Sequence, residues 1–167
     1  MITIKEILIG TDFGPAADNA LRYGEALARQ FGARLHVLHA TPNVFATSID
    51  GLGLAAIPPQ VQEDIEVAAR RHMRERVSDE DRQELRAKTV VLTHNSPALA
   101  ITEYARQHAI DLIVLGTHGR GALAHVLLGN VAERVVRTAP CPVLTVRDPE
   151  HEFVLPDALV AVSKGDR

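Results

Sequence analysis

Short apolar runs alternate with longer stretches of helical periodicity along most of this chain, and this alternation constrains the fold more than any other feature. The runs lie at residues 4–10, 34–40, 88–93, 111–115 and 142–147. Between them, apolar side chains recur at the spacing of amphipathic helices. Strands separated by helices of this length form a parallel sheet with right-handed crossovers and helices on both faces. We therefore predict a single-domain, doubly wound α/β fold with a five-stranded parallel sheet.

Glycine, proline and small polar residues predict where the helices begin and end. Pro15 is suited to the first position of a helix, and Gly32 is placed to end it. Ser96 and Pro97 predict a later helix start, as N-cap and first helical residue.

The region between the second and third predicted strands has its own boundaries. Residues 41–58 are rich in proline, glycine and small side chains, which predicts a long loop. A charged helix follows over residues 60–77. Ser78, with Asp81 three residues later, resembles a capping box, so we expect the helix to break there and restart briefly.

The composition excludes several classes of function. The 167 residues, 46% hydrophobic and 23% charged, fit one ordinary globular domain. The net charge of -3 and the absence of tryptophan offer no general basis for nucleic-acid binding. No apolar run is long enough for a membrane span or a signal-peptide core. The lone Cys141 cannot close a disulfide within the chain, so we expect a reducing, cytoplasmic location.

A glycine-rich segment follows the fourth predicted strand. It reads GTHGRG from Gly116 and is followed, eight residues later, by Gly129, Asn130 and Val131. Glycines let a phosphate approach the backbone, and a helix that begins at Asn130 offers free N–H groups to an anion. Both glycine clusters could therefore converge on one polyphosphate. A tight turn followed by an N-capped helix explains the same residues without a ligand, and the P-loop and dinucleotide-binding fingerprints are both absent.

At this point the chain resembles a known family. Gly116, two residues, Gly119, nine residues and Gly129 match the ATP-binding motif of universal stress proteins, with Asn130 in place of the final Ser or Thr. The stretches ILIGTDFG, LHVLHA, DLIVLGTHGRG and RTAPCPVLTVR resemble further segments of that family in matching order. The resemblance implies the strand order 3-2-1-4-5, with a nucleotide site where the first and fourth strands end, as expected for an open α/β sheet.

The resemblance also assigns roles to residues. It implies that Asp12 and the backbone of Ala40 contact adenine, while the glycine loop and Asn130 hold the ribose and phosphates of ATP, with Mg²⁺. The expected nucleotide-binding residues are Gly10, Thr11, Asp12, Ala40, Leu115, Gly116, His118, Gly119, Arg120, Gly129, Asn130 and Val131. Asn95, beside His94, stands where the family often has glycine, and it would narrow or reshape the cleft.

Other conspicuous residues have plainer explanations. His36 and His39 are three apart on a predicted strand, so they face opposite sides and do not form a metal pair. The charged stretch 70–86 interleaves both signs, which indicates a solvated helix face with i,i+4 pairs. Cys141 lies between two prolines without a neighbouring base, which indicates a structural residue rather than a nucleophile.

We therefore expect residues 1–147 to form a cytoplasmic, ATP-binding stress-response domain that acts as a nucleotide-dependent dimeric switch. The resemblance implies a homodimer through strand 142–147. No general base or water-positioning group can be named, so we expect at most slow ATP hydrolysis. The composition and charge lead us to expect no nucleic acid or membrane as partner. Two alternatives stay open: an interaction module of the same fold that binds no nucleotide, and an enzyme acting on an adenylate. The tail, residues 148–167, is either a mobile terminus or a segment packed on a neighbouring subunit.

Overall fold

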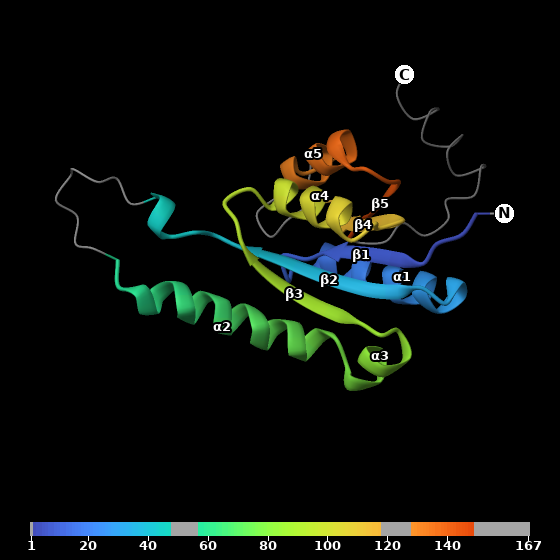
Figure 1. Cartoon of the computed structure of the whole chain (residues 1–167), viewed down its shortest axis with the longest axis horizontal. Helices are drawn as coiled ribbons and strands as arrows, with labels where there is room; N and C mark the ends of the chain where they lie inside the picture. Colours follow the sequence, from blue (N-terminus) through green and yellow to red (C-terminus); the bar gives the residue numbers. More distant parts are fainter. Residues whose placement is uncertain (1, 48–56, 118–127, 149–167) are drawn as a thin grey trace, which may run out of the picture.

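The five predicted strands form one parallel sheet in the order β3-β2-β1-β4-β5 (Figure 1). The computed structural model describes residues 2–47, 57–117 and 128–148. The strands are β1 (Glu6–Gly10), β2 (Arg34–Thr41), β3 (Lys88–Thr93), β4 (Leu112–Gly116) and β5 (Val143–Val146). The helices are α1 (Pro15–Phe31), the short η1 (Phe45–Thr47), α2 (Pro59–Arg76), α3 (Asp79–Glu84), α4 (Pro97–Gln107) and α5 (Asn130–Thr138). The predicted fold class and strand order are both confirmed.

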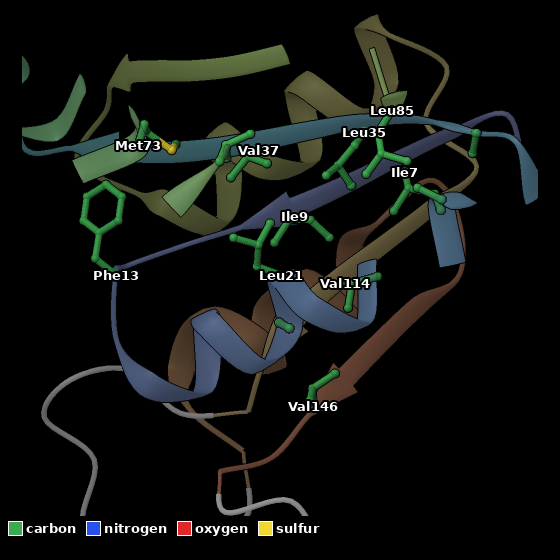
Figure 2. Packing of buried hydrophobic residues seen from close by; sticks show 14 of the residues in the cluster. Ile7, Ile9, Phe13, Leu21, Leu35, Val37, Met73, Leu85, Val114 and Val146 are labelled. Carbon is green, nitrogen blue, oxygen red and sulfur yellow. The ribbon is translucent and has the colours of Figure 1, made fainter. Parts of the chain in front are cut away.

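Helices cover both faces of the sheet, because the central strands are apolar on both faces. Ile7 and Ile9 of β1 belong to the core cluster that includes residues of α1 and α2. Leu8, between them, belongs to the second cluster, formed with α4 and α5. Figure 2 shows the first cluster, with Leu21 of α1 and Met73 of α2 on the same side of the sheet as Ile9.

The predicted helix boundaries agree with the structure within a residue. Gly32 adopts the left-handed conformation, φ 63°, at the C-cap of α1. The break after α2 is also confirmed: the Ser78 side chain accepts a hydrogen bond from the Asp81 N–H and caps α3. Ser96 occupies the N-cap position of α4, with Pro97 as the first helical residue.

Helix α2 packs on the β2–β3 side of the sheet with a narrow apolar stripe. Ala69 and Met73 are buried, whereas Val61 and Val67 are exposed. Most of the remaining surface of the helix is polar or charged. Throughout the described ranges, no helix has both the length and the apolar character required to cross a bilayer.

Candidate functional site

The strands end at two different heights along the carboxyl edge of the sheet. Gly10, the last residue of β1, pairs with Leu38 of β2 on one side and with Leu115 of β4 on the other. Strand β1 ends there and β4 ends at Gly116, but β2 continues three residues past Leu38, to Thr41. At ~3.3 Å per residue, β2 rises about 10 Å above the end of β1. The edge therefore has a step at β1 and β4, the point where the strand order reverses.

The turn that carries Asp12 begins at this step and is built by local hydrogen bonds. The Thr11 N–H donates to the carbonyl oxygen of Leu38 at 2.9 Å, which anchors the turn to β2. The Phe13 N–H donates to the Thr11 hydroxyl at 3.0 Å, and the Gly14 N–H donates to Oδ1 of Asp12 at 2.9 Å. Within this turn Phe13 adopts the left-handed region, φ 64°, at a cost of about 1–3 kcal/mol.

Gly116, at the end of β4, lies directly against the first turn of α1. A Cβ at this position would lie 2.7 Å from the carbonyl carbon of Ala16 and 2.9 Å from its oxygen. Gly10 is similarly confined, because a Cβ there would lie 2.5 Å from Cδ2 of Leu115. Only glycine lets β4 end this close to α1, so close packing explains Gly116 whether or not a ligand binds.

The end of β4 and the start of α5 meet at Thr117. The Thr117 N–H donates to the carbonyl oxygen of Val146 at 2.7 Å, which extends the pairing of β4 with β5. The Gly129 N–H donates to the carbonyl oxygen of Thr117, also at 2.7 Å. The start of α5 is thereby held at the end of β4. The predicted site residues His118, Gly119 and Arg120 lie outside the described residues.

The last helix begins at Asn130, as predicted, but the Asn130 side chain does not cap it. Gly129 occupies the N-cap position and no side chain caps the helix, so Asn130 is the first helical residue and is exposed. The Glu133 N–H makes an intrahelical bond to the carbonyl oxygen of Gly129 at 2.9 Å. The N–H groups of Asn130, Val131 and Ala132 precede that bond. They point out of the start of the helix, where the dipole favours an anion.

The wall formed by β2 above the step offers backbone groups to a ligand. Ala40 pairs with Leu92 of β3, whereas the pairing of β1 with β2 extends only to Gly10 and Leu38. On this wall, His39 donates from Nδ1 to the carbonyl oxygen of Thr11 at 2.7 Å, because a carbonyl can only accept. Ala40 and Asp12 thus both lie beyond the last pair of β1 with β2, at this step.

Asn95 contacts the loop after β2. Its side-chain oxygen accepts a hydrogen bond from the Asn43 N–H at 2.7 Å, which joins the loops after β2 and β3. The His94 ring accepts from the Ser96 N–H at 2.9 Å. Asn95 and His94 therefore shape the loop after β3, next to the loop after β2.

The interpretation of the charged stretch as a plain solvated face is wrong for Arg76. Its Nη2 donates to the carbonyl oxygen of Phe13 at 3.1 Å, and its Nε donates to Asp18 of α1 at 2.7 Å. Arg70 does form the expected i,i+4 pair, with Glu66. Local spacing held no signal for Arg76, because both of its partners lie in the first helix and its preceding turn.

The described residues contain no group of three or more His, Cys, Asp or Glu side chains able to hold a metal ion. Magnesium at nucleotide sites is held through one or two protein ligands together with phosphate oxygens and water.

Known structures share this architecture. The UspA universal stress protein of Lactobacillus plantarum matches 88% of this chain and 100% of its own, with a TM-score of 0.71 and 26% identity. A universal stress protein in complex with cAMP, 21% identical, covers 87% of this chain at a TM-score of 0.53. One from Archaeoglobus fulgidus in complex with dAMP, 20% identical, covers 87% at 0.54. The last two likenesses show the shared fold.

Sequence comparison reaches the same family. Residues 3–147 match the universal stress protein family. A universal stress protein of Thermus aquaticus is 35% identical over 143 residues, which are 86% of this chain and 98% of that protein. The protein MJ0531 of Methanocaldococcus jannaschii is 30% identical over 148 residues, 89% of this chain and 85% of its own. The chain therefore belongs to the universal stress protein family.

Proposed function

We propose that this chain binds an adenine nucleotide, ATP with Mg²⁺, beyond the carboxyl ends of β1 and β4. The hydrogen bond from Gly129 to Thr117 carries this proposal, because it brings the start of α5 to the end of β4. A phosphate at that point would meet both the N–H groups of α5 and the glycine backbone after β4. Two structures of the same fold, in complex with cAMP and dAMP, support the choice of an adenine nucleotide.

Each end of the nucleotide has proposed partners. At the adenine end, a carboxylate oxygen of Asp12 would accept from the amino group, and the backbone of Ala40 would read the ring edge. At the phosphate end we assign the backbone after Leu115, with Gly116, and the α5 start at Asn130. Gly10, Thr11, Gly129 and Val131 complete this set, together with His118, Gly119 and Arg120 outside the described residues.

The site depends on local groups rather than on the overall field of the protein. The net charge is -3, which repels a polyphosphate. Backbone N–H groups carry no net charge, and the start of α5 carries only a partial positive charge. The attraction of that partial charge for an anion is confined to the first turn of the helix. Affinity should therefore fall sharply when the start of α5 is altered and little when remote surface charges change.

The first experiment identifies the ligand. The purified chain is denatured, and the released small molecules are measured by mass spectrometry; the refolded protein is then titrated with ATP and Mg²⁺ by calorimetry. We expect release of an adenine nucleotide and saturable heat. If no nucleotide is released and the titration gives no heat, the proposal is overturned, and an interaction module that binds no nucleotide is favoured. Product formed from an added adenylate would instead indicate an enzyme.

The second experiment tests the site. Asp12→Asn should weaken ATP binding by about ten-fold, equivalent to the loss of one charge-assisted hydrogen bond of about 1.4 kcal/mol. The matched control is Asp79→Asn on α3, whose side chain is 98% exposed. Both variants remove one negative charge, so equal affinities for the two would contradict the assignment of Asp12.

We further propose that the nucleotide biases a homodimer formed through β5. Strand β5 ends the sheet, so it offers an edge for pairing with a second copy. It also exposes Leu144, and α5, which begins at the proposed phosphate site, leads directly into it. Hydrolysis, measured as phosphate release, should be slow. If the wild-type chain releases many phosphates per second and Asp12→Ala abolishes this release, the protein is an efficient enzyme and the proposed switch is overturned.

A further inference from the structure

Arg76 joins the end of α2 to the turn that carries Asp12. Its guanidinium donates from Nη2 to the carbonyl oxygen of Phe13, at 3.1 Å, and from Nε to Asp18, at 2.7 Å. Its Cζ also lies 5.1 Å from the centroid of the Phe13 ring, within range of a cation–π contact. One side chain thus contacts the backbone and the ring of Phe13 and the first turn of α1.

Phe13 is enclosed from the other side by β2. The His39 ring lies 4.2 Å from the Phe13 ring, centroid to centroid, and its Nδ1 donates to the carbonyl oxygen of Thr11. The His72 ring, from α2, lies 5.2 Å from the Phe13 ring. Figure 2 shows Phe13 directly after β1, at the margin of the core cluster that includes Met73. The residue that follows Asp12 is therefore held by side chains from two elements, α2 and β2.

The backbone of Phe13 explains why such a clamp is needed. Its φ of 64° lies in the left-handed region, which bulky residues rarely adopt. Strained residues of this kind persist only where their surroundings over-determine them, and they gather at ligand-binding sites. An arginine suits the task, because its planar, permanently charged group bonds a carbonyl and a carboxylate together while it covers an aromatic ring.

We propose that Arg76 is a positioning residue that holds Phe13 in its left-handed conformation and thereby aims the Asp12 carboxylate at the adenine nucleotide. This inference rests on the proposed function. It makes α2 part of the binding apparatus, although Arg76 itself does not contact the nucleotide. The alternative is that Arg76 only stabilises the fold through its ion pair with Asp18.

A double-mutant cycle separates the two roles. Arg76→Ala should weaken ATP binding by about ten-fold in the wild-type background, and by less than about two-fold in the Asp12→Asn background, because Arg76 acts through Asp12. Arg76→Lys, with a single ammonium, should lie between wild type and Arg76→Ala. The control is Arg74→Ala, which removes the same charge from an exposed position of α2 and should leave the affinity unchanged.

Hydrogen exchange tests the clamp without a ligand. A peptide that covers residues 11–14 should exchange faster in Arg76→Ala than in wild type or Arg74→Ala. An equal loss of affinity in both Asp12 backgrounds, or unchanged exchange, would overturn the inference and leave a structural role. If the wild-type chain binds no nucleotide, the proposed function fails, and exchange alone decides whether Arg76 holds the turn.

Discussion

Gly116 lies so close to Ala16 that a Cβ at Gly116 would come within 2.7 Å of the carbonyl carbon of Ala16. The contact is to backbone, which cannot rotate away as a side chain can. Gly116→Ala should therefore destabilise the fold by about 1–3 kcal/mol, the cost of overpacking. Urea denaturation measures the free energy of unfolding.

A second glycine provides the control, because its requirement is of another kind. Gly32 adopts φ 63°, and a Cβ there would meet nothing within 4 Å. Gly32→Ala should cost about 1–2 kcal/mol from the left-handed backbone alone, and Gly32→Asn less, since asparagine tolerates that region. At Gly116, asparagine should be worse than alanine. The opposite order at Gly116 would refute the steric explanation.

His36 should make the stability of the protein depend on pH. The side chain is buried, its Nε2 lies 2.8 Å from Oε2 of Glu6, and its Nδ1 lies 2.8 Å from the Tyr104 hydroxyl. Burial lowers the pKa of His36 below 6.5; the hydrogen bond and charge of Glu6 oppose this shift, and His108 and Lys88 add to it. The neutral ring can donate to Glu6 and accept from Tyr104, so both nitrogens are satisfied without a positive charge.

The sign of the effect follows from this depressed pKa. Below pH 6.5 the unfolded chain binds more proton at His36 than the folded chain does, so this contribution to stability is present above that pH and falls as the pH drops below it. His36→Asn should flatten the fall in the free energy of unfolding between pH 7.5 and 5.5. Equal curves for wild type and His36→Asn would contradict the mechanism.

Asn19 should be sensitive to the loss of its amide. It is buried on α1, where Nδ2 donates to the carbonyl oxygen of Arg147 at 3.2 Å and to Asp148 at 3.1 Å, while Oδ1 accepts from Arg22. Asn19→Leu removes these hydrogen bonds at similar side-chain volume, and it should lower the free energy of unfolding by about 1–3 kcal/mol. Gln30→Leu, exposed on the same helix, should change the thermal midpoint little. Equal midpoints for the two variants would show that these bonds do not stabilise the fold.

Asn130 tests the departure from the family motif. Because it is exposed at the first position of α5 and caps nothing, its substitution should leave stability nearly unchanged. Asn130→Ser should retain ATP binding, since either side chain can donate to a phosphate, whereas Asn130→Leu should weaken it by about three-fold or more. Calorimetric titration gives both affinities. Tight binding by Asn130→Leu would remove Asn130 from the proposed site.

Leu144 tests the proposed dimer. It is 37% exposed on the edge strand β5, and Val136 of α5 is 49% exposed. Leu144→Lys should raise the dimer dissociation constant by at least about ten-fold, the effect of losing about 1.4 kcal/mol. Val67→Lys, on α2 at 52% exposure, should leave the dimer intact in sedimentation measurements. A wild-type chain that sediments as a monomer at micromolar concentration would refute the dimer itself.

Local sequence signals predicted the elements of this fold well, because the interactions that bound them act over a few residues. Gly32 ends α1, and Ser78 and Asp81 restart the chain as α3, as expected. His36 and His39 do face opposite sides, toward Tyr104 and Phe13 respectively. The strand order is not contained in such local patterns, and it followed from the resemblance to a family.

The candidate site was predictable only in part. Glycine spacing and a helix start, both visible in the sequence, indicated that the segment after β4 and the start of α5 could converge, and the hydrogen bond from Gly129 to Thr117 does bring the start of α5 to the end of β4. The contact of Arg76 with Phe13 was not visible, because it joins α2 to the turn before α1, 63 residues away in the chain. Gly129 rather than Asn130 caps α5 because the extended backbone that an N-cap requires lies one residue earlier, at ψ 156°.

The pairing of the central strands also sets the order in which the sheet can form during synthesis. Ile7 of β1 pairs with Leu35 of β2 on one side and with Leu112 of β4 on the other. During synthesis from the amino end, β2 and β3 emerge early, but one edge of β1 waits for most of the chain to leave the ribosome. A nascent chain that stops before Leu112 therefore carries an unpaired central strand, open to association with other chains. The ends of β1 and β4 come together only after that point, so the proposed nucleotide site cannot form until the chain has been translated past Gly116.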